Sequence, residues 1–117
     1  LFNKVIIKSG LDSFLNQLPD GYNSSVGEKG LKLSGGQQQK IAIARALYKE
    51  PEIIILDEAT NALDQNSENQ ILKKIHDLKE KMTIIIVSHK KDTFRYCDVV
   101  YNIEDAKLEI VKNHSYK

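Results

Sequence analysis

The chain has 117 residues, of which 41% are hydrophobic and 28% charged, and its net charge is +1 at pH 7. This length supports one domain or part of one, and the near-neutral balance excludes a strong field directed at nucleic acid or a membrane surface. The single cysteine, Cys97, excludes an internal disulfide and a cysteine-based zinc site. The apolar runs are too short to span a bilayer, and no signal peptide is recognisable. Because the first residue is Leu1 and not Met, we expect a processed or excised piece.

The first third of the chain is predicted to be helical and then to enter a long loop. A short helix over 1–8 ends at Ser9-Gly10, a break before the next helix. Turn-forming residues and two further glycines then fill the loop at 19–30. Between these segments, four apolar residues follow the i, i+3, i+4, i+7 spacing of one helix face: Leu11, Phe14, Leu15 and Leu18.

The middle of the chain predicts a βαβ unit. A helix runs from Gln37 to about Tyr48 and ends before Pro51, which disfavours helix in the residue that precedes it. The apolar run at 53–56 is β-branched and continuous, as in a parallel strand buried on both faces. An amphipathic helix over 67–81 and a second buried strand over 83–87 complete the unit. After it, we expect a short helix near 90–96 and a hairpin that pairs 99–103 with 108–112.

Ser34, Gly35, Gly36 and Gln37 stand at the start of the helix that ends near Tyr48. One interpretation is a capping box, in which Ser34 caps the helix and Gln37 bonds back to it. That interpretation does not explain the two glycines, because glycine is a poor helix former. A helix N-terminus with bare amides also binds anions, and small residues let a phosphate come close. From these residues alone, both interpretations remain open.

Asp57 and Glu58 directly follow the first predicted strand. Ligands of parallel sheets bind beyond the carboxyl ends of the strands, which is where these two carboxylates should lie. One of them can hold Mg²⁺, directly or through water, while the other polarises an attacking water. The alternative is that they are acidic residues capping the next helix.

His89 follows the second predicted strand by two residues, so we expect it at the same edge as Asp57 and Glu58. A neutral imidazole there could donate a hydrogen bond to a phosphate oxygen. The alternative is an incidental surface histidine, which is how we interpret His76 and His114.

Four short motifs, in this order and spacing, resemble the nucleotide-binding domain of the ATP-binding cassette (ABC) family. They are "LSGGQ" at 33–37, "LDEAT" at 56–60, "ALD" at 62–64 and "SH" at 88–89. The resemblance covers essentially the whole chain. The stretch "LPDGYNSSVGEKG" at 18–30 is in addition similar to exporter-type half-transporters, which move lipids, drugs, peptides or lipid-linked sugars.

The resemblance implies a cofactor pair, ATP and Mg²⁺, and a role for each motif. The pentapeptide would be the signature motif, which meets the γ-phosphate of a nucleotide held by a partner domain. The implied roles are phosphate binding by Ser34, Gly35, Gly36 and Gln37, magnesium binding through water by Asp57, catalysis by Glu58 with the switch histidine His89, and a D-loop contact by Asp64.

The resemblance also implies an α/β fold, the C-terminal half of a P-loop NTPase (ABC ATPase) domain. Residues 1–48 would belong to its helical signature subdomain. Residues 49–117 would form the C-terminal part of the RecA-like catalytic core, with a partial parallel sheet and flanking helices. The pattern G-x-x-x-x-G-K-[ST] does not occur in the chain, so the Walker A part is absent. We therefore expect ATPase activity of the complete parent domain and none of this chain alone.

The implied partners are a second nucleotide-binding domain, paired head to tail, and the coupling helices of a transmembrane domain, with no nucleic acid. The location would be the cytoplasmic face of the inner or plasma membrane, through a transmembrane domain that is not in this chain. Two residues depart from the exporter pattern: Ser25, where an acid is frequent, and Asn61, where the D-loop usually begins with serine.

Two alternatives to an exporter ATPase remain open. One is a cassette ATPase of the DNA-repair or chromosome-maintenance kind, against which the segment 18–30 and the lack of a coiled-coil run before residue 33 argue. The other is a non-enzymatic product, either a truncated fragment or a partner subunit that supplies only the signature face.

Overall fold

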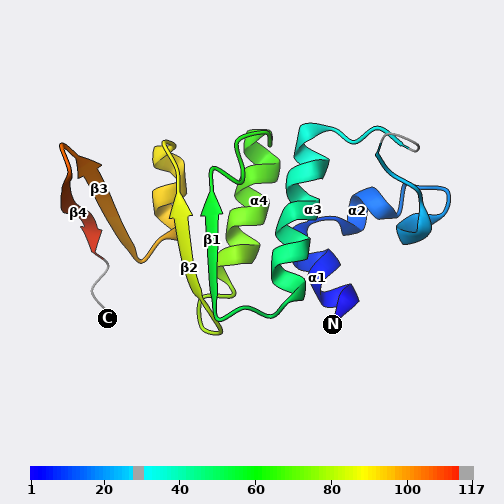
Figure 1. Cartoon of the computed structure of the whole chain (residues 1–117), viewed down its shortest axis with the longest axis horizontal. Helices are drawn as coiled ribbons and strands as arrows, with labels where there is room; N and C mark the ends of the chain where they lie inside the picture. Colours follow the sequence, from blue (N-terminus) through cyan, green and yellow to red (C-terminus); the bar gives the residue numbers. More distant parts are fainter. Residues whose placement is uncertain (28–30, 114–117) are drawn as a thin grey trace. The chain divides into compact units, whose positions relative to one another are not determined.

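The computed structural model describes residues 1–27 and 31–113, which fall into two compact units that divide between Val87 and Ser88. The glycine-rich loop predicted at 19–30 therefore lies partly outside the described residues. The first unit contains, in chain order, α1 (Phe2–Ser9), α2 (Asp12–Leu15), the 3₁₀ turn η1 (Gly21–Asn23), α3 (Gly35–Tyr48), β1 (Ile53–Asp57), α4 (Gln65–His76) and β2 (Thr83–Val87), as Figure 1 shows.

The two N-terminal helices are separated where the sequence predicts a break. Gly10 has a φ of 71° and ends α1 in the left-handed conformation that glycine favours. The second helix is shorter than predicted, since α2 ends at Leu15 and not at Leu18. Its continuation is a tightened turn in which the N–H of Leu18 donates to the carbonyl of Leu15. Pro19 keeps this turn from continuing as a helix, because proline disfavours helix in the preceding residue.

The predicted βαβ unit is confirmed. Strands β1 and β2 pair in parallel, from Ile53 opposite Thr83 to Asp57 opposite Val87, and α4 connects them. This helix begins two residues earlier than predicted and ends at His76, before the expected end at 81. Leu78 lies beyond the helix in the turn that follows and is still buried.

One face of this sheet packs against the helices. The hydrophobic core joins Ile54 and Leu56 of β1 to buried side chains of α1, α3 and α4. The remaining buried members of the core are Val5, Leu11, Ile43, Ala44, Leu47, Leu63, Ile71, Ile75 and Leu78.

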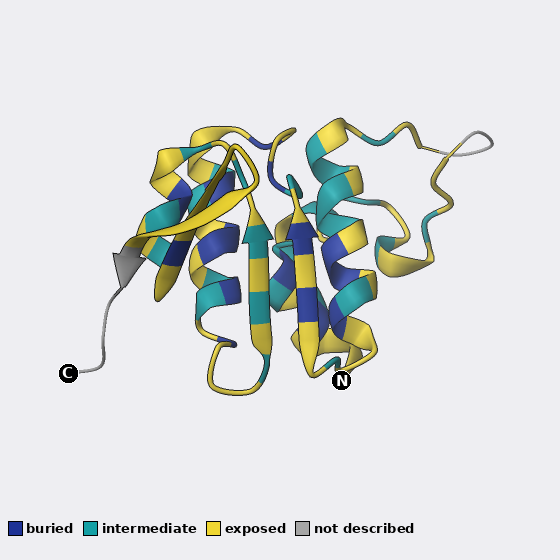
Figure 2. Cartoon of the chain, turned by 60° about the vertical axis from the view of Figure 1, so that its left-hand side comes forward, coloured by how far each residue is buried: buried dark blue, intermediate teal, exposed yellow. Residues whose placement is uncertain are grey.

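The prediction that both strands are buried on two faces is wrong for the described residues. Exposure alternates along β1, where Ile53 is 58% and Ile55 is 64% exposed, and Figure 2 shows the same alternation. On β2, Ile85 and Val87 are also exposed. Successive side chains of a strand point to opposite faces, and the described part of the chain supplies helices for only one of them.

The second unit contains a 3₁₀ helix, η2 (Lys91–Tyr96), and the strands β3 (Val99–Glu104) and β4 (Lys107–Asn113). The strands form an antiparallel hairpin, which confirms the predicted pairing. Asp105 and Ala106 at its tip both have positive φ, as the type I′ turn of a two-residue hairpin requires.

None of the helices formed by residues 1–27 and 31–113 is long and apolar enough to cross a membrane. The predicted division into a helical portion, 1–48, and a core portion, 49–117, concerns the parent domain and stays a prediction.

Candidate functional site

The start of α3 is a complete capping box, as the sequence predicts. The N–H of Gln37 donates a 3.2 Å hydrogen bond to Oγ of Ser34, and the N–H of Ser34 donates a 2.8 Å bond to Oε1 of Gln37. Gly35 and Gly36 form the first turn of the helix. Their amides have no acceptor within the helix, because the first N–H groups of any α-helix lack one. The capping box therefore fixes a helix start that still presents two unused donors.

The structure gives the two glycines a role within the chain itself. A Cβ atom placed on Gly35 would lie 3.1 Å from Cβ of Ala62, and one on Gly36 would lie 3.1 Å from Cδ2 of Leu63. Both distances are tighter than ordinary van der Waals contact, so glycine lets the start of α3 approach the loop that follows β1. The N–H of Ala62 also donates a 3.0 Å hydrogen bond to Oε1 of Gln39, which ties this loop to α3.

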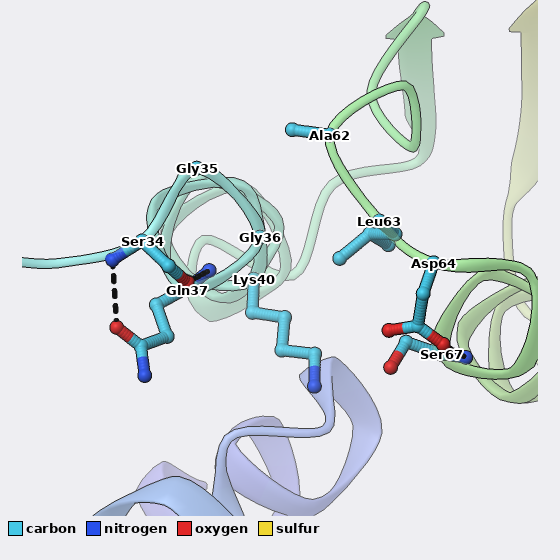
Figure 3. Close-up of a pocket in the computed structure, with 9 residues that line it drawn as sticks. All are labelled: Ser34, Gly35, Gly36, Gln37, Lys40, Ala62, Leu63, Asp64 and Ser67. Atoms are coloured by element: carbon cyan, nitrogen blue, oxygen red, sulfur yellow. Dashed lines mark hydrogen bonds between the residues drawn. The ribbon is translucent and has the colours of Figure 1, made fainter.

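A pocket of about 230 Å³ lies between the start of α3 and the start of α4. Figure 3 shows its lining, with the side chain of Lys40 extending from α3 toward the space beside Asp64 and Ser67. Lys40 was not among the predicted site residues. The signal for it was its position four residues after Gly36, which places both on one helix face. The pocket thus combines a cation, a carboxylate and the open end of a helix.

Asp64 caps α4, and its carboxylate is held by several donors. Its Oδ1 accepts a 3.0 Å hydrogen bond from the N–H of Ser67. The backbone and then the side chain of Ser67 hold the pKa of Asp64 below its ordinary value, because hydrogen bonds to the charged form favour it. The structure therefore gives Asp64 a capping role, and its predicted D-loop contact stays a prediction.

Asp57 and Glu58 lie at the carboxyl end of β1, where the sequence places them. Asp57 is exposed and is the last residue of the strand. Glu58 has a φ of 47°, and its N–H donates a 3.0 Å hydrogen bond to the carbonyl of Val87 at the end of β2. Its Oε2 accepts a 2.8 Å bond from Nδ2 of Asn61. The carboxylate that would polarise water is therefore held by a side chain of the same turn.

His89 is exposed and belongs to the second unit, two residues after β2 ends. In that unit, the neighbouring Ser88 accepts a 3.0 Å hydrogen bond from the N–H of Lys90 and lies 3.2 Å, Oγ to Oγ1, from Thr93. The predicted position of His89 beside Asp57 and Glu58 stays a prediction.

The residues present fit a phosphate group and one metal-binding carboxylate. The two free amides of Gly35 and Gly36 suit an anion, and Asp57 is an exposed carboxylate of the kind that Mg²⁺ takes together with phosphate oxygens. Within the described ranges, no cluster of three or more His, Cys, Asp or Glu side chains could enclose a metal ion. Further ligands of a metal would have to come from water, from the nucleotide or from other parts of the domain.

Comparison with known proteins identifies the family. The ABC transporter family profile matches residues 4–61. An ABC transporter B family member 13 of Arabidopsis thaliana is 46% identical over 104 residues, which is 89% of this chain and 8% of that protein. A putative export ATP-binding/permease protein of Rickettsia bellii is 39% identical over 113 residues, which is 97% of this chain and 20% of that protein.

A solved structure of a bacterial Atm1-family ABC exporter with ATP bound matches the fold with a TM-score of 0.82 and 36% identity. The match covers 92% of this chain and 19% of that one. The chain thus spans at most about a fifth of the length of these three relatives.

These likenesses, together with the helices and the parallel sheet, define the α/β fold of a P-loop ABC ATPase. The chain belongs to the ABC transporter family, and the exporters among its relatives match it over part of their length. The predicted family and fold class are confirmed. The comparisons do not favour the DNA-repair and chromosome-maintenance alternative or the non-enzymatic one.

Proposed function

We propose that this chain supplies the signature face and the catalytic carboxylate of an ATPase that drives export across a membrane. The observation that carries the proposal is the start of α3, where a capping box fixes two unused amides, those of Gly35 and Gly36. A fixed helix start with bare amides is suited to a phosphate group. In the proposal, that phosphate is the γ-phosphate of a nucleotide held by a second domain, paired head to tail with this one.

The exposure of this surface supports a contact with a second domain. Ser34 and Gly35 are exposed, while Gly36 and Gln37 are only partly covered. Ser34 uses its hydroxyl oxygen as an acceptor for the N–H of Gln37, so its hydroxyl proton remains available for a phosphate oxygen. Ser34, Gly35 and Gly36 would thus bind the phosphate, and Gln37 would hold Ser34 in place.

The carboxyl end of β1 would carry the chemistry. A bound Mg²⁺ would neutralise phosphate charge, and Asp57 would hold it through water. Glu58 would take the proton of the attacking water as general base, which typically contributes about 10²–10⁴-fold to a rate. His89 would donate a hydrogen bond to a phosphate oxygen, and Asp64 would contact the partner domain from the D-loop.

This chain alone would be inactive, because it carries no G-x-x-x-x-G-K-[ST] sequence to hold the nucleotide phosphates. Activity would require the complete domain, a second domain like it and a transmembrane domain whose coupling helices contact the region near residues 26–30. The domain would then lie at the cytoplasmic face of the inner or plasma membrane. The near-neutral charge gives no support to a nucleic-acid partner.

The test is ATP-dependent dimerisation of the complete nucleotide-binding domain, measured by sedimentation in a Glu58→Gln background that prevents turnover. We expect Ser34→Arg to keep the domain monomeric, because the larger side chain would fill the space for the partner's phosphate. The matched control is Ser34→Thr, which keeps a capping hydroxyl at this position and should still dimerise. Dimerisation of Ser34→Arg to the same extent as wild type would contradict the proposed contact.

A further inference from the structure

Glu68 is a buried acidic residue in the first turn of α4, with 2% of its surface exposed. Acidic side chains are almost never fully buried unless a partner satisfies them. Here Oε1 of Glu68 accepts a 2.6 Å hydrogen bond from Oγ1 of Thr60, which is itself buried. A buried carboxylate of α4 thus holds a residue of the loop that joins β1 to α4.

Thr60 lies at the centre of two overlapping turns in that loop. The N–H of Asn61 donates to the carbonyl of Glu58, and the N–H of Leu63 donates to the carbonyl of Thr60, both at 3.1 Å. The first turn begins at Glu58, and the second leads to Asp64 at the start of α4. The position of Thr60 therefore determines how the chain leaves Glu58.

Glu58 depends on such support because its backbone is strained. Its φ of 47° lies in the left-handed region, which residues other than glycine adopt only at a cost. Conformations of this kind persist where the surrounding structure over-determines them. On one side, the N–H of Glu58 is held by the carbonyl of Val87. On the other side, the carbonyl of Glu58 is held by the N–H of Asn61, in the turn that contains Thr60.

We propose that Glu68 is a positioning residue for Glu58 and acts through Thr60, an inference that rests on the proposed role of Glu58 as general base. The buried hydrogen bond fixes the turn, and the turn fixes the direction in which Glu58 leaves β1. Because a misplacement of about 1 Å can cost about 10²-fold in rate, loss of this bond lowers turnover without removing any group that binds ATP.

The test uses the complete nucleotide-binding domain and measures kcat and KM for ATP below the melting temperature of every variant. Thr60→Val removes the hydroxyl and keeps the branched shape, and we expect kcat to fall at least about tenfold with KM changed less than about twofold. Thr60→Ser keeps the hydroxyl and should restore kcat to within about threefold of wild type. The matched control is Ser9→Ala, which removes another buried hydroxyl, one that donates to the carbonyl of Ile6 within α1. It should leave kcat unchanged.

A second variant keeps the test decisive if Thr60→Val does not fold. Glu68→Gln keeps the shape and an acceptor oxygen, but a neutral oxygen accepts a weaker hydrogen bond than a carboxylate, so we expect kcat to fall about threefold at unchanged KM. In the Glu58→Gln background, neither Thr60→Val nor Glu68→Gln should lower turnover further.

Two outcomes separate this inference from the proposed function. If Glu58→Gln abolishes turnover while Thr60→Val and Glu68→Gln both leave kcat within about twofold of wild type, the positioning role is overturned and the proposed function stands. If Glu58→Gln itself turns over ATP like wild type, the proposed function fails, and the positioning role fails with it.

Discussion

Nδ2 of Asn61 donates a 2.8 Å hydrogen bond to Oε2 of Glu58. Asn61 is one of the two residues that depart from the exporter pattern, in which serine is usual at this position. The longer amide side chain reaches the carboxylate of Glu58, and the backbone N–H of Asn61 also donates to the Glu58 carbonyl. The departure therefore adds a contact to the residue proposed as general base and removes no phosphate or metal ligand.

The close contact between Gly35 and Ala62 predicts coupling between these two positions. In the middle of a helix, a change from glycine to alanine stabilises by about 0.5–1 kcal/mol, and a smaller gain of the same sign would apply at Gly35, the first residue of α3. We expect no such gain, because the new Cβ would lie 3.1 Å from Cβ of Ala62. The double variant Gly35→Ala with Ala62→Gly should recover stability relative to the sum of the single changes. Denaturant unfolding of the complete domain measures this, and full additivity of the two changes would contradict the contact.

The exposed face of the β1–β2 sheet predicts that the isolated chain self-associates. Ile53, Ile55, Ile85 and Val87 are between 46% and 64% exposed on these two strands, and contiguous apolar patches of this kind favour association. Light scattering on residues 1–117 measures it. The double variant Ile55→Lys with Ile85→Lys should lower the scattering, because it places charge on the face.

The matched control is Tyr22→Lys with Tyr48→Lys, which adds the same two charges at exposed residues outside the sheet. It should leave the scattering of the isolated chain unchanged. A wild-type chain that stays monomeric and melts in one cooperative transition would show that the exposed face of the β1–β2 sheet does not cause self-association.

The lowered pKa of Asp64 predicts a pH-dependent contribution to stability. The charged form is favoured in the folded state. Its contribution is therefore complete above the unfolded pKa of about 3.9 and is lost as the pH falls through the lower folded pKa. Asn is an equally good cap without the charge. In the complete domain, the melting temperature of wild type should exceed that of Asp64→Asn at pH 7. This difference, the gap in melting temperature, should close toward pH 3. A gap that does not change with pH would contradict the contribution of the charge.

Short-range patterns made several features predictable from the sequence. The capping box depends on Ser34 and Gln37, three residues apart, and the βαβ unit depends on apolar runs that flank one amphipathic helix. The bond from Thr60 to Glu68 was not predictable, because burial of a carboxylate depends on tertiary packing. The residues of the two strands, taken alone, predict a sheet buried on both faces, for a related reason. A β-branched run shows that a strand is apolar, but which segments cover it is not encoded in the strand.

The most direct test of the account compares ATP turnover and ATP binding of the complete nucleotide-binding domain with those of Glu58→Gln. The glutamine oxygen can still accept the hydrogen bond from Asn61, and Asp57 is untouched, so the substitution removes the charge of the base and little else. We expect steady-state turnover to fall by about 10²-fold or more, as loss of a general base predicts, while ATP affinity stays close to that of wild type. Turnover close to wild type would show that Glu58 is not the catalytic base and would contradict the account.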